Sequence, residues 1–383
     1  MRIVLAGAHG FGRTYLGVLR EAAEDGRAEL AGICDLRPVP AGALEGLGSP
    51  AQSGDLAGLV KQTAADVVIV ATPIHTHVPL ALTALRAGAH LLLEKPPAPS
   101  LAEFDRLLAA TREHGALCQV GFQSLGSAAP RAVRRMITDG LIGAVRGIGA
   151  AGAWSRDTSY YRRASWAGRR RLDGTDVVDG ALTNPFAHAV ATVLALDGGE
   201  ITSIETELFH AFDIEADDTS CLRVRTSGGL ADGAPLTVAV TLAAPEQRPP
   251  VITVHGERGR ISLWYTLDQV RLERAGEPSV TTTYERTGLL ADLLARLEPG
   301  GESGGGLLVP LSATRPFTQV LEAVRTAEDP LPLRAEEHPA QDPSTGAVRR
   351  VVPGITDLVT ASAERLALFS ELPQFSGPAG RHV

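Results

Sequence analysis

Short apolar runs alternate with stretches of helical periodicity over the first 125 residues of the chain. Five of these runs have the length and composition of β-strands, at residues 2–6, 30–35, 66–71, 90–94 and 117–122. The runs are almost wholly apolar, as are the strands of a parallel sheet that helices cover on both faces. The alternation therefore predicts a doubly wound parallel α/β domain over residues 1–125.

The pattern changes after about residue 145, where β-rich runs follow one another directly. They occupy residues 201–209, 221–226, 236–242, 251–255 and 260–265. We therefore expect a second, α+β domain over residues 126–383, built on a large, mainly antiparallel open sheet. Helical stretches at 317–328 and 355–371 are expected to pack on one of the two domains, the first domain being one alternative. A chain of 383 residues is long enough for two hydrophobic cores.

The composition excludes several classes of partner. A net charge of −8 and the lack of a long Lys/Arg run argue against a nucleic-acid partner. No apolar stretch reaches the roughly twenty residues that cross a bilayer, and a signal-peptide pattern is missing, so we expect a cytoplasmic protein without a membrane partner. The three cysteines, Cys34, Cys118 and Cys221, are scattered and odd in number, which fits neither disulfide pairs nor a zinc site.

A glycine-rich turn follows the first predicted strand and precedes a helical stretch. Gly7, Gly10 and Gly12 allow the backbone to approach a pyrophosphate and to aim N–H groups at it, as in Rossmann-type dinucleotide sites. His9 stands where the usual motif has its middle glycine, and Phe11 lies between the last two glycines. A tight turn without a ligand is the alternative interpretation of this motif taken alone.

An acidic residue at the end of the second predicted strand favours the dinucleotide interpretation. Asp35 lies at the distance from the glycine turn at which such sites place the carboxylate that binds the adenosine ribose. A carboxylate there accepts hydrogen bonds from ribose hydroxyls and repels a 2′-phosphate, which favours NAD. Arg37 would pair with a 2′-phosphate if Asp35 turned away, so NADP stays open as the alternative.

Further motifs resemble one family over essentially the whole chain. Glu94-Lys95-Pro96 after the strand at 90–94, Ala71-Thr72-Pro73 and His77 upstream of it, and the segment up to His188 resemble the Gfo/Idh/MocA oxidoreductases. The resemblance implies a Rossmann domain and a C-terminal α/β domain whose open sheet commonly forms oligomer contacts, hence a homodimer or homotetramer. It implies a substrate of the sugar or cyclitol type. It also places Glu94, Thr72, Pro73 and His77 in the cofactor cleft.

The resemblance assigns the catalytic residues. Lys95 matches the family lysine that lies between nicotinamide and substrate, where a cation stabilises negative charge developing on oxygen. His188 matches the histidine of the family motif G-x-L-x-D-x-G-x-H and is the expected general base. Asn184 replaces the aspartate of that motif. An amide cannot relay a proton, although it can bind a substrate hydroxyl.

Aromatic and basic residues cluster at 154–171 in a chain otherwise poor in aromatics. Aromatic faces pack on sugar rings and arginine forks bind hydroxyls or anions, so Tyr161, Arg163 and Trp166 are predicted to bind substrate, together with Gln123. A basic loop at an oligomer interface is the alternative. His75 and His77 form an H-x-H pair, but no further ligand lies close by in the sequence, so we expect no metal site.

Three functions remain in competition. The first is an NAD(P)-dependent dehydrogenase that moves a hydride between nicotinamide and a ring carbon of a sugar, glycoside or cyclitol. The second keeps the cofactor and cleaves glycosides through transient oxidation and elimination. The third is a dinucleotide-binding sensor without turnover, against which the retention of Lys95 and His188 argues.

Overall fold

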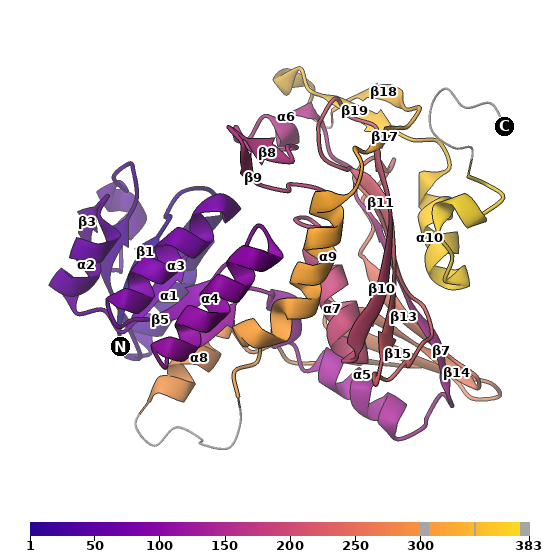
Figure 1. The fold of residues 1–383 in the computed structure, drawn as a ribbon, viewed down its shortest axis with the longest axis horizontal. Coiled ribbons are helices and arrows are strands. Elements are labelled where there is room, and N and C mark those ends of the chain that lie inside the picture. The colour runs from indigo at the N-terminus through magenta and orange to yellow at the C-terminus, as the bar shows by residue number, and fades with distance from the viewer. Residues whose placement is uncertain (299–305, 341, 376–383) are drawn as a thin grey trace. The chain divides into compact units, whose positions relative to one another are not determined.

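The computed structural model describes residues 1–298, 306–340 and 342–375. The chain forms two compact units (Figure 1). The first unit consists of Met1–Gly126 and Thr287–Thr318, and the second of Ser127–Arg286 and Gln319–Val383. The predicted division placed everything after residue 125 in the second domain. The structure differs in returning residues 287–318 to the first unit.

A six-stranded sheet forms the centre of the first unit, in the order β3-β2-β1-β4-β5-β6 with every neighbouring pair parallel. Its strands are β1 Arg2–Ala6, β2 Glu29–Cys34, β3 Ala51–Ser53, β4 Val67–Val70, β5 His90–Leu93 and β6 Cys118–Val120. Its helices are α1 Arg13–Glu24, α2 Leu56–Thr63, α3 His77–Arg86, α4 Leu101–Glu113 and α8 Leu289–Leu297. This order is that of a Rossmann sheet and confirms the predicted fold of this domain.

The returning segment attaches to the edge strand β6 through Gln119, which is wholly buried. Its Nε2 donates to the carbonyl of Leu289 at 3.2 Å and to Asp292 Oδ2 at 2.7 Å. Its Oε1 accepts from the backbone N–H of Val309 at 2.9 Å. Because one side chain satisfies three partners, α8 and residues 308–309 close the edge of the sheet.

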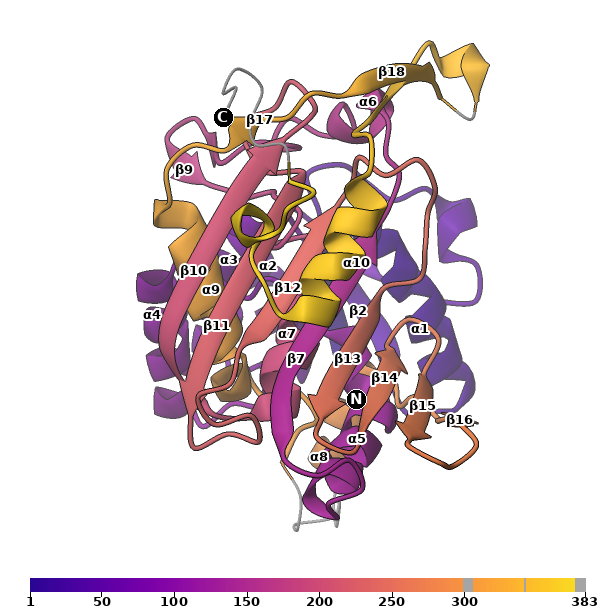
Figure 2. The same ribbon diagram turned by 90° about the vertical axis from the view of Figure 1, so that its right-hand side faces the viewer.

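A nine-stranded sheet forms the second unit, in the order β16-β15-β14-β13-β7-β12-β11-β10-β17 (Figure 2). Only the pairs β7–β12 and β10–β17 are parallel, which confirms the predicted mainly antiparallel sheet. The strands are β7 Val145–Ala153, β10 Glu200–His210, β11 Thr219–Ser227, β12 Leu236–Thr241, β13 Val251–Gly256, β14 Gly259–Trp264, β15 Gln269–Arg274, β16 Val280–Thr283 and β17 Leu331–Pro332.

Among the described residues, two short hairpins and five helices complete this unit. The hairpins pair β8 Arg171–Leu172 with β9 Thr175–Asp176, and β18 Glu336–Pro339 with β19 Val348–Val351. The helices are α5 Ala129–Thr138, α6 Thr158–Tyr161, α7 Ala187–Asp197, α9 Arg315–Thr326 and α10 Ile355–Arg365. The division between the two units falls within α9, after Thr318.

Helices cover both faces of the large sheet, with α5 and α7 on one face and α10 on the other (Figures 1 and 2). The helix α10 packs on β7 and β12, and its Ile355 and Val359 join a buried cluster with Phe209 and Phe369. Of the two alternatives for the C-terminal helices, α10 therefore follows the one in which they pack on the second domain. Among the described residues, no helix is long and apolar enough to cross a membrane.

Candidate functional site

The glycine-rich turn of the first unit lies where β1 ends and α1 begins. Gly7 has a φ of +85° and Gly10 a φ of +59°, which glycine adopts without strain. A Cβ on Gly12 would lie 1.8 Å from the carbonyl oxygen of Gly7, and one on Gly7 would lie 2.7 Å from that of Ala71. A Cβ on Gly10 would meet nothing within 4 Å, so space beside the turn is open. These features fit a cradle for a pyrophosphate.

Asp35 is tied to this turn, as the motif spacing predicts. Its Oδ2 accepts from the backbone N–H of Ala8 at 2.9 Å, and its Oδ1 accepts from that of Arg37 at 3.1 Å. The imidazole of His9 lies 3.8 Å from Oδ1 and 3.2 Å from the carbonyl oxygen of Arg37. His9, Asp35 and Arg37 thus lie together beside the glycine turn, and the binding of a ribose by Asp35 stays a prediction. Phe11 is 58% exposed beside them.

His77 joins the segments that follow β4 and β5. It is buried, and its Nδ1 lies 2.8 Å from the carbonyl oxygen of Pro96 while its Nε2 lies 2.7 Å from that of Thr72. Burial lowers the pKa of His77 to about 4, against the two carbonyls, which act to raise it. His77 therefore connects Thr72 with Pro96, and the place of Thr72, Pro73 and His77 in the cofactor cleft stays a prediction.

A buried carboxylate supports the segment that contains Lys95. The Oε1 of Glu94 accepts from the Tyr15 hydroxyl at 2.5 Å, and its Oε2 accepts from the backbone N–H of Lys95 at 3.1 Å. Burial raises the pKa of the Glu94 carboxyl, which the Tyr15 hydrogen bond opposes. A Cβ on Gly121 would lie 2.8 Å from Glu94, so the adjacent loop must approach this carboxylate closely. Glu94 thus holds the backbone of Lys95 in place.

Lys95 is unusual in this chain because lysine is rare in it. The chain has only two lysines, Lys61 and Lys95, among 36 basic residues. A lysine ammonium is a compact point charge, whereas an arginine guanidinium is a planar fork, so a lysine at position 95 is suited to a size-restricted contact.

The segment of the second unit that leads into α7 contains Asn184. This side chain is half-buried, and its Nδ2 donates to the carboxylate of Asp179 at 2.5 Å. The turn around it is fixed by Asp217, whose Oδ2 accepts from the backbone N–H of Ala181 at 3.0 Å. Sequence reasoning assigned neither carboxylate to the site, because neither belongs to the motif that identified Asn184.

His188 lies in the first turn of α7. Nearly every other residue of this helix is buried, whereas His188 is half-buried. A histidine that only fills a helix interface would be buried like its neighbours. Its partial exposure, one helical turn after Asn184, suits a group that must exchange a proton with a ligand.

The aromatic and basic cluster is held together by its own contacts. The guanidinium of Arg163 lies 3.8 Å from the centre of the Tyr160 ring and 4.7 Å from that of Trp166. It also donates to both oxygens of Asp179, at 3.1 and 2.9 Å. Tyr161 packs against Phe212, with 4.9 Å between the ring centres. Arg163 and Trp166 thereby lie in one group with Asp179, while Tyr161 contacts the core.

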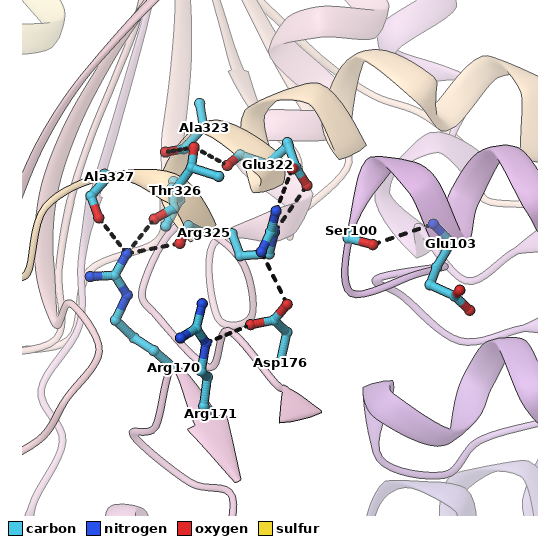
Figure 3. Close-up of polar contacts among 11 residues, drawn as sticks. Ser100, Glu103, Arg170, Arg171, Asp176, Glu322, Ala323, Arg325, Thr326 and Ala327 are labelled. Atoms are coloured by element: carbon cyan, nitrogen blue, oxygen red, sulfur yellow. Dashed lines mark hydrogen bonds and ion pairs between the residues drawn. The ribbon is translucent and has the colours of Figure 1, made fainter. Parts of the chain in front are cut away.

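The last two arginines of this cluster, Arg170 and Arg171, contact the end of α9 and the β8–β9 hairpin (Figure 3). Arg170 donates to the carbonyls of Val324, Arg325, Ala327 and Glu328 and to the Asp329 carboxylate. Arg171 pairs with Asp176 at 3.0 Å, and Arg325 pairs with the same carboxylate at 3.1 Å. A cavity of about 680 Å³ lies beside these contacts, and its lining includes both basic and acidic side chains, those of Arg170, Arg171, Arg325, Asp176 and Asp329.

The remaining predicted residue, Gln123, opens a short 3-10 helix at Gln123–Gly126 of the first unit and is half-buried. Lys95 and Gln123 belong to the first unit, and Asn184, His188, Tyr161, Arg163 and Trp166 to the second. Within the described parts of the chain, no group of three His, Cys, Asp or Glu side chains could hold a metal ion.

Comparison with known proteins bears on both units. The family model described as an oxidoreductase family with an NAD-binding Rossmann fold matches residues 1–122. The GFO/IDH/MocA C-terminal domain matches residues 131–262. The first match confirms the predicted NAD-binding domain.

Curated relatives align over parts of the chain. A 1-carboxy-3-chloro-3,4-dihydroxycyclohexa-1,5-diene dehydrogenase of Comamonas testosteroni is 26% identical over 204 residues, which are 53% of this chain and 49% of the relative. The D-glucoside 3-dehydrogenase of Escherichia coli is 30% identical over 118 residues, 30% of this chain and 34% of the relative. The chain spans about half or less of the length of these relatives.

Solved structures share the fold over most of the chain. The WlbA dehydrogenase of Bordetella pertussis, solved with NADH and UDP-GlcNAcA, has a TM-score of 0.68 at 24% identity and covers 87% of this chain and 99% of its own. An aldose-aldose oxidoreductase of Caulobacter crescentus has a TM-score of 0.69 at 19% identity, over 85% and 96% of the two chains. With both domain models matched in order, the chain belongs to the Gfo/Idh/MocA oxidoreductase family.

Proposed function

We propose that this protein is an NAD-dependent oxidoreductase that acts on a CH–OH group at a ring carbon of a sugar, glycoside or cyclitol. The observation that carries the proposal is the intact dinucleotide cradle, in which Asp35 is bonded to the backbone of the glycine turn at Ala8. The names of relatives support the substrate class, since they include a D-glucoside 3-dehydrogenase and a dihydroxycyclohexadiene dehydrogenase.

Four side chains carry the proposed binding and chemistry. Bound NAD supplies the hydride acceptor. Lys95 hydrogen-bonds the reacting oxygen and stabilises the negative charge that develops on it. His188 takes the hydroxyl proton, for which a neutral imidazole is suited. Asn184 binds a neighbouring hydroxyl of the substrate, and Asp35 selects the ribose of NAD over the 2′-phosphate of NADP.

The test is to incubate the purified protein with NAD and a panel of sugars, glycosides and inositols and to measure NADH formation by its absorbance. We expect turnover with at least one compound. We expect Lys95→Ala to lower kcat/KM by about a hundredfold or more while NAD affinity stays within a few fold. Lys61→Ala, which changes the other lysine, is the matched control and should keep wild-type activity.

Three results would contradict the proposal. Wild-type activity in Lys95→Ala would remove the assigned role of this residue. Glycoside cleavage at sub-stoichiometric NAD without accumulated NADH would indicate the elimination route instead. The absence of turnover over the whole panel, with tight NAD binding, would favour a sensor.

A further inference from the structure

Asn184 is the only asparagine among the 383 residues. It occupies the position where the family motif has aspartate, and its amide contacts a carboxylate, that of Asp179. The single asparagine of the chain therefore lies beside a buried acid.

The contact fixes which way the amide points. Both oxygens of Asp179 accept hydrogen bonds from Arg163, and the atom of Asn184 that faces this group is the donor Nδ2. The two ends of a planar amide diverge, so Oδ1 lies on the other side of the group. Residue 184 consequently directs a hydrogen-bond acceptor away from Asp179, as the family carboxylate would, without its charge.

Asp179 is well suited to hold this orientation. It is 6% exposed, and besides Asn184 it accepts from Arg163 and from the backbone N–H of Gly168 at 2.8 Å. The preceding residue, Val178, has a φ of +44°, a conformation that costs energy for a β-branched side chain. Its backbone and that of Asp179 are bonded to residues 169–170, which hold the strained turn in place.

The family aspartate would not fit beside Asp179. Two carboxylates at the separation of this hydrogen bond repel each other, and one of them would have to take up a proton. Aspartate at 179 and an amide at 184 are therefore chemically matched.

We propose that Asp179 is a positioning residue that holds Asn184 with Oδ1 directed away from the acid, so that residue 184 recognises a substrate hydroxyl group as hydrogen-bond donor. The recognition of a substrate hydroxyl rests on the proposed function. The orientation of the amide does not. The same carboxylate holds Arg163 between Tyr160 and Trp166, so one buried group connects the aromatic cluster to Asn184.

The single asparagine makes the orientation directly observable. Labelling with asparagine carrying ¹⁵N in its side chain gives one amide pair in a proton–nitrogen spectrum. We expect Asp179→Ala to speed the exchange of the protected Nδ2 proton with water at least tenfold and to shift the pair toward free asparagine. Asp176→Asn, which changes another arginine-paired acid of the same segment, should leave the signal unchanged. A signal that is the same in the wild type and in Asp179→Ala overturns the proposal.

Kinetics test the recognition step with whichever substrate the panel yields. Monodeoxy analogues of that substrate identify the hydroxyl whose loss matters in the wild type and no longer matters in Asn184→Ala. We expect Asp179→Ala to lose discrimination at the same hydroxyl, by about tenfold in kcat/KM. Full discrimination in Asp179→Ala would overturn the positioning role, whereas a panel without any substrate would count against the proposed function and leave the amide signal to decide the pairing.

Discussion

At the scale of single residues, buried carboxylates hold the polar turns of the second unit. Asp217 and Asp218 are adjacent and wholly or almost wholly buried. Asp217 bonds the segment before α7, while Asp218 accepts from the backbone N–H groups of Ala211 and Phe212 at 2.7 and 2.8 Å. Buried carboxylates of this kind are tolerated only because hydrogen-bond donors replace the water that they lose.

Asp218 makes stability depend on pH. Burial raises the pKa of its carboxyl to about 6, above the value of about 3.9 in an unfolded chain. The folded state therefore binds more protons between about pH 4 and 6, so this residue lowers the free energy of unfolding as the pH rises through that window. An asparagine at this position would keep an oxygen for both N–H groups without the charge.

We expect the free energy of unfolding of Asp218→Asn, relative to that of the wild type, to rise by about 2 kcal/mol between pH 4.5 and pH 7.5. Urea unfolding of both proteins at the two pH values measures this difference. Thr219, whose hydroxyl donates to Asp218 at 3.0 Å, can turn its proton to Thr241 at 2.8 Å and accept from the new amide. Parallel pH profiles of the two proteins would contradict the assignment.

The glycine turn gives a second prediction at this scale. Gly12→Ala places a methyl group 1.8 Å from the Gly7 carbonyl oxygen, so the turn must open and NAD affinity should fall at least tenfold by calorimetry. The matched control is Gly17→Ala in α1, where the new methyl group meets nothing within 4 Å. That change should leave NAD binding intact and raise stability by up to about 1 kcal/mol through helix propensity. Equal affinities in the two variants would refute the cradle.

At the scale of elements, the side chain of Arg170 caps the C-terminal end of α9. Four carbonyls at and beyond the end of this helix accept hydrogen bonds from the guanidinium of Arg170, a side chain that is 16% exposed. Carbonyls at a helix C-terminus have no partners within the helix and need them from elsewhere. The side chain of Arg170 therefore supplies hydrogen-bond donors for them.

We expect Arg170→Ala to lower the free energy of unfolding by about 2 to 3 kcal/mol in chemical denaturation, because several carbonyls lose a charged donor. Arg171→Ala removes an exposed ion pair with Asp176 and should cost less than about 1 kcal/mol. An equal loss in both variants would mean that the carbonyl contacts contribute little.

The elements also show what sequence can and cannot predict. Apolar runs located β1, β2, β4, β5 and β6 within a few residues, because burial on both faces leaves a strong signal. The strand β3 has three residues and none is buried, so no such run exists. The central strand β7 reads VRGIGAAGA, which is poor in the β-branched residues typical of strands.

The reason for the small residues of β7 lies in partners distant in sequence. A Cβ on Gly149 would lie 1.9 Å from the carbonyl oxygen of Ala363 in α10, and one on Gly152 would lie 2.3 Å from the ring of Phe186. Both faces of the strand are thus in contact with other elements. The same limit applies to Asp179, whose importance depends on contacts with Arg163, Gly168 and Asn184 that no local pattern reveals.

At the scale of the whole molecule, the chain crosses between its units repeatedly, after Gly126, after Arg286 and after Thr318. A prediction from local patterns places a boundary where the pattern of apolar runs changes, and that signal exists near residue 125. No comparable change in the sequence marks the point where the chain returns to the first unit, because the sequence of α8 is that of an ordinary amphipathic helix. Its assignment depends on Gln119, a buried polar residue at the far end of the first segment.

This closure sets an order of events during synthesis. When the ribosome has released residues 1–126, all six strands of the first sheet exist, but Gln119 has none of its partners in α8 or at Val309. Those arrive only after most of the nine-stranded sheet has been translated. Until then the β6 edge of the nascent first unit is uncovered and the side-chain amide of Gln119 lacks these partners. We expect a fragment that ends at residue 126 to keep both features.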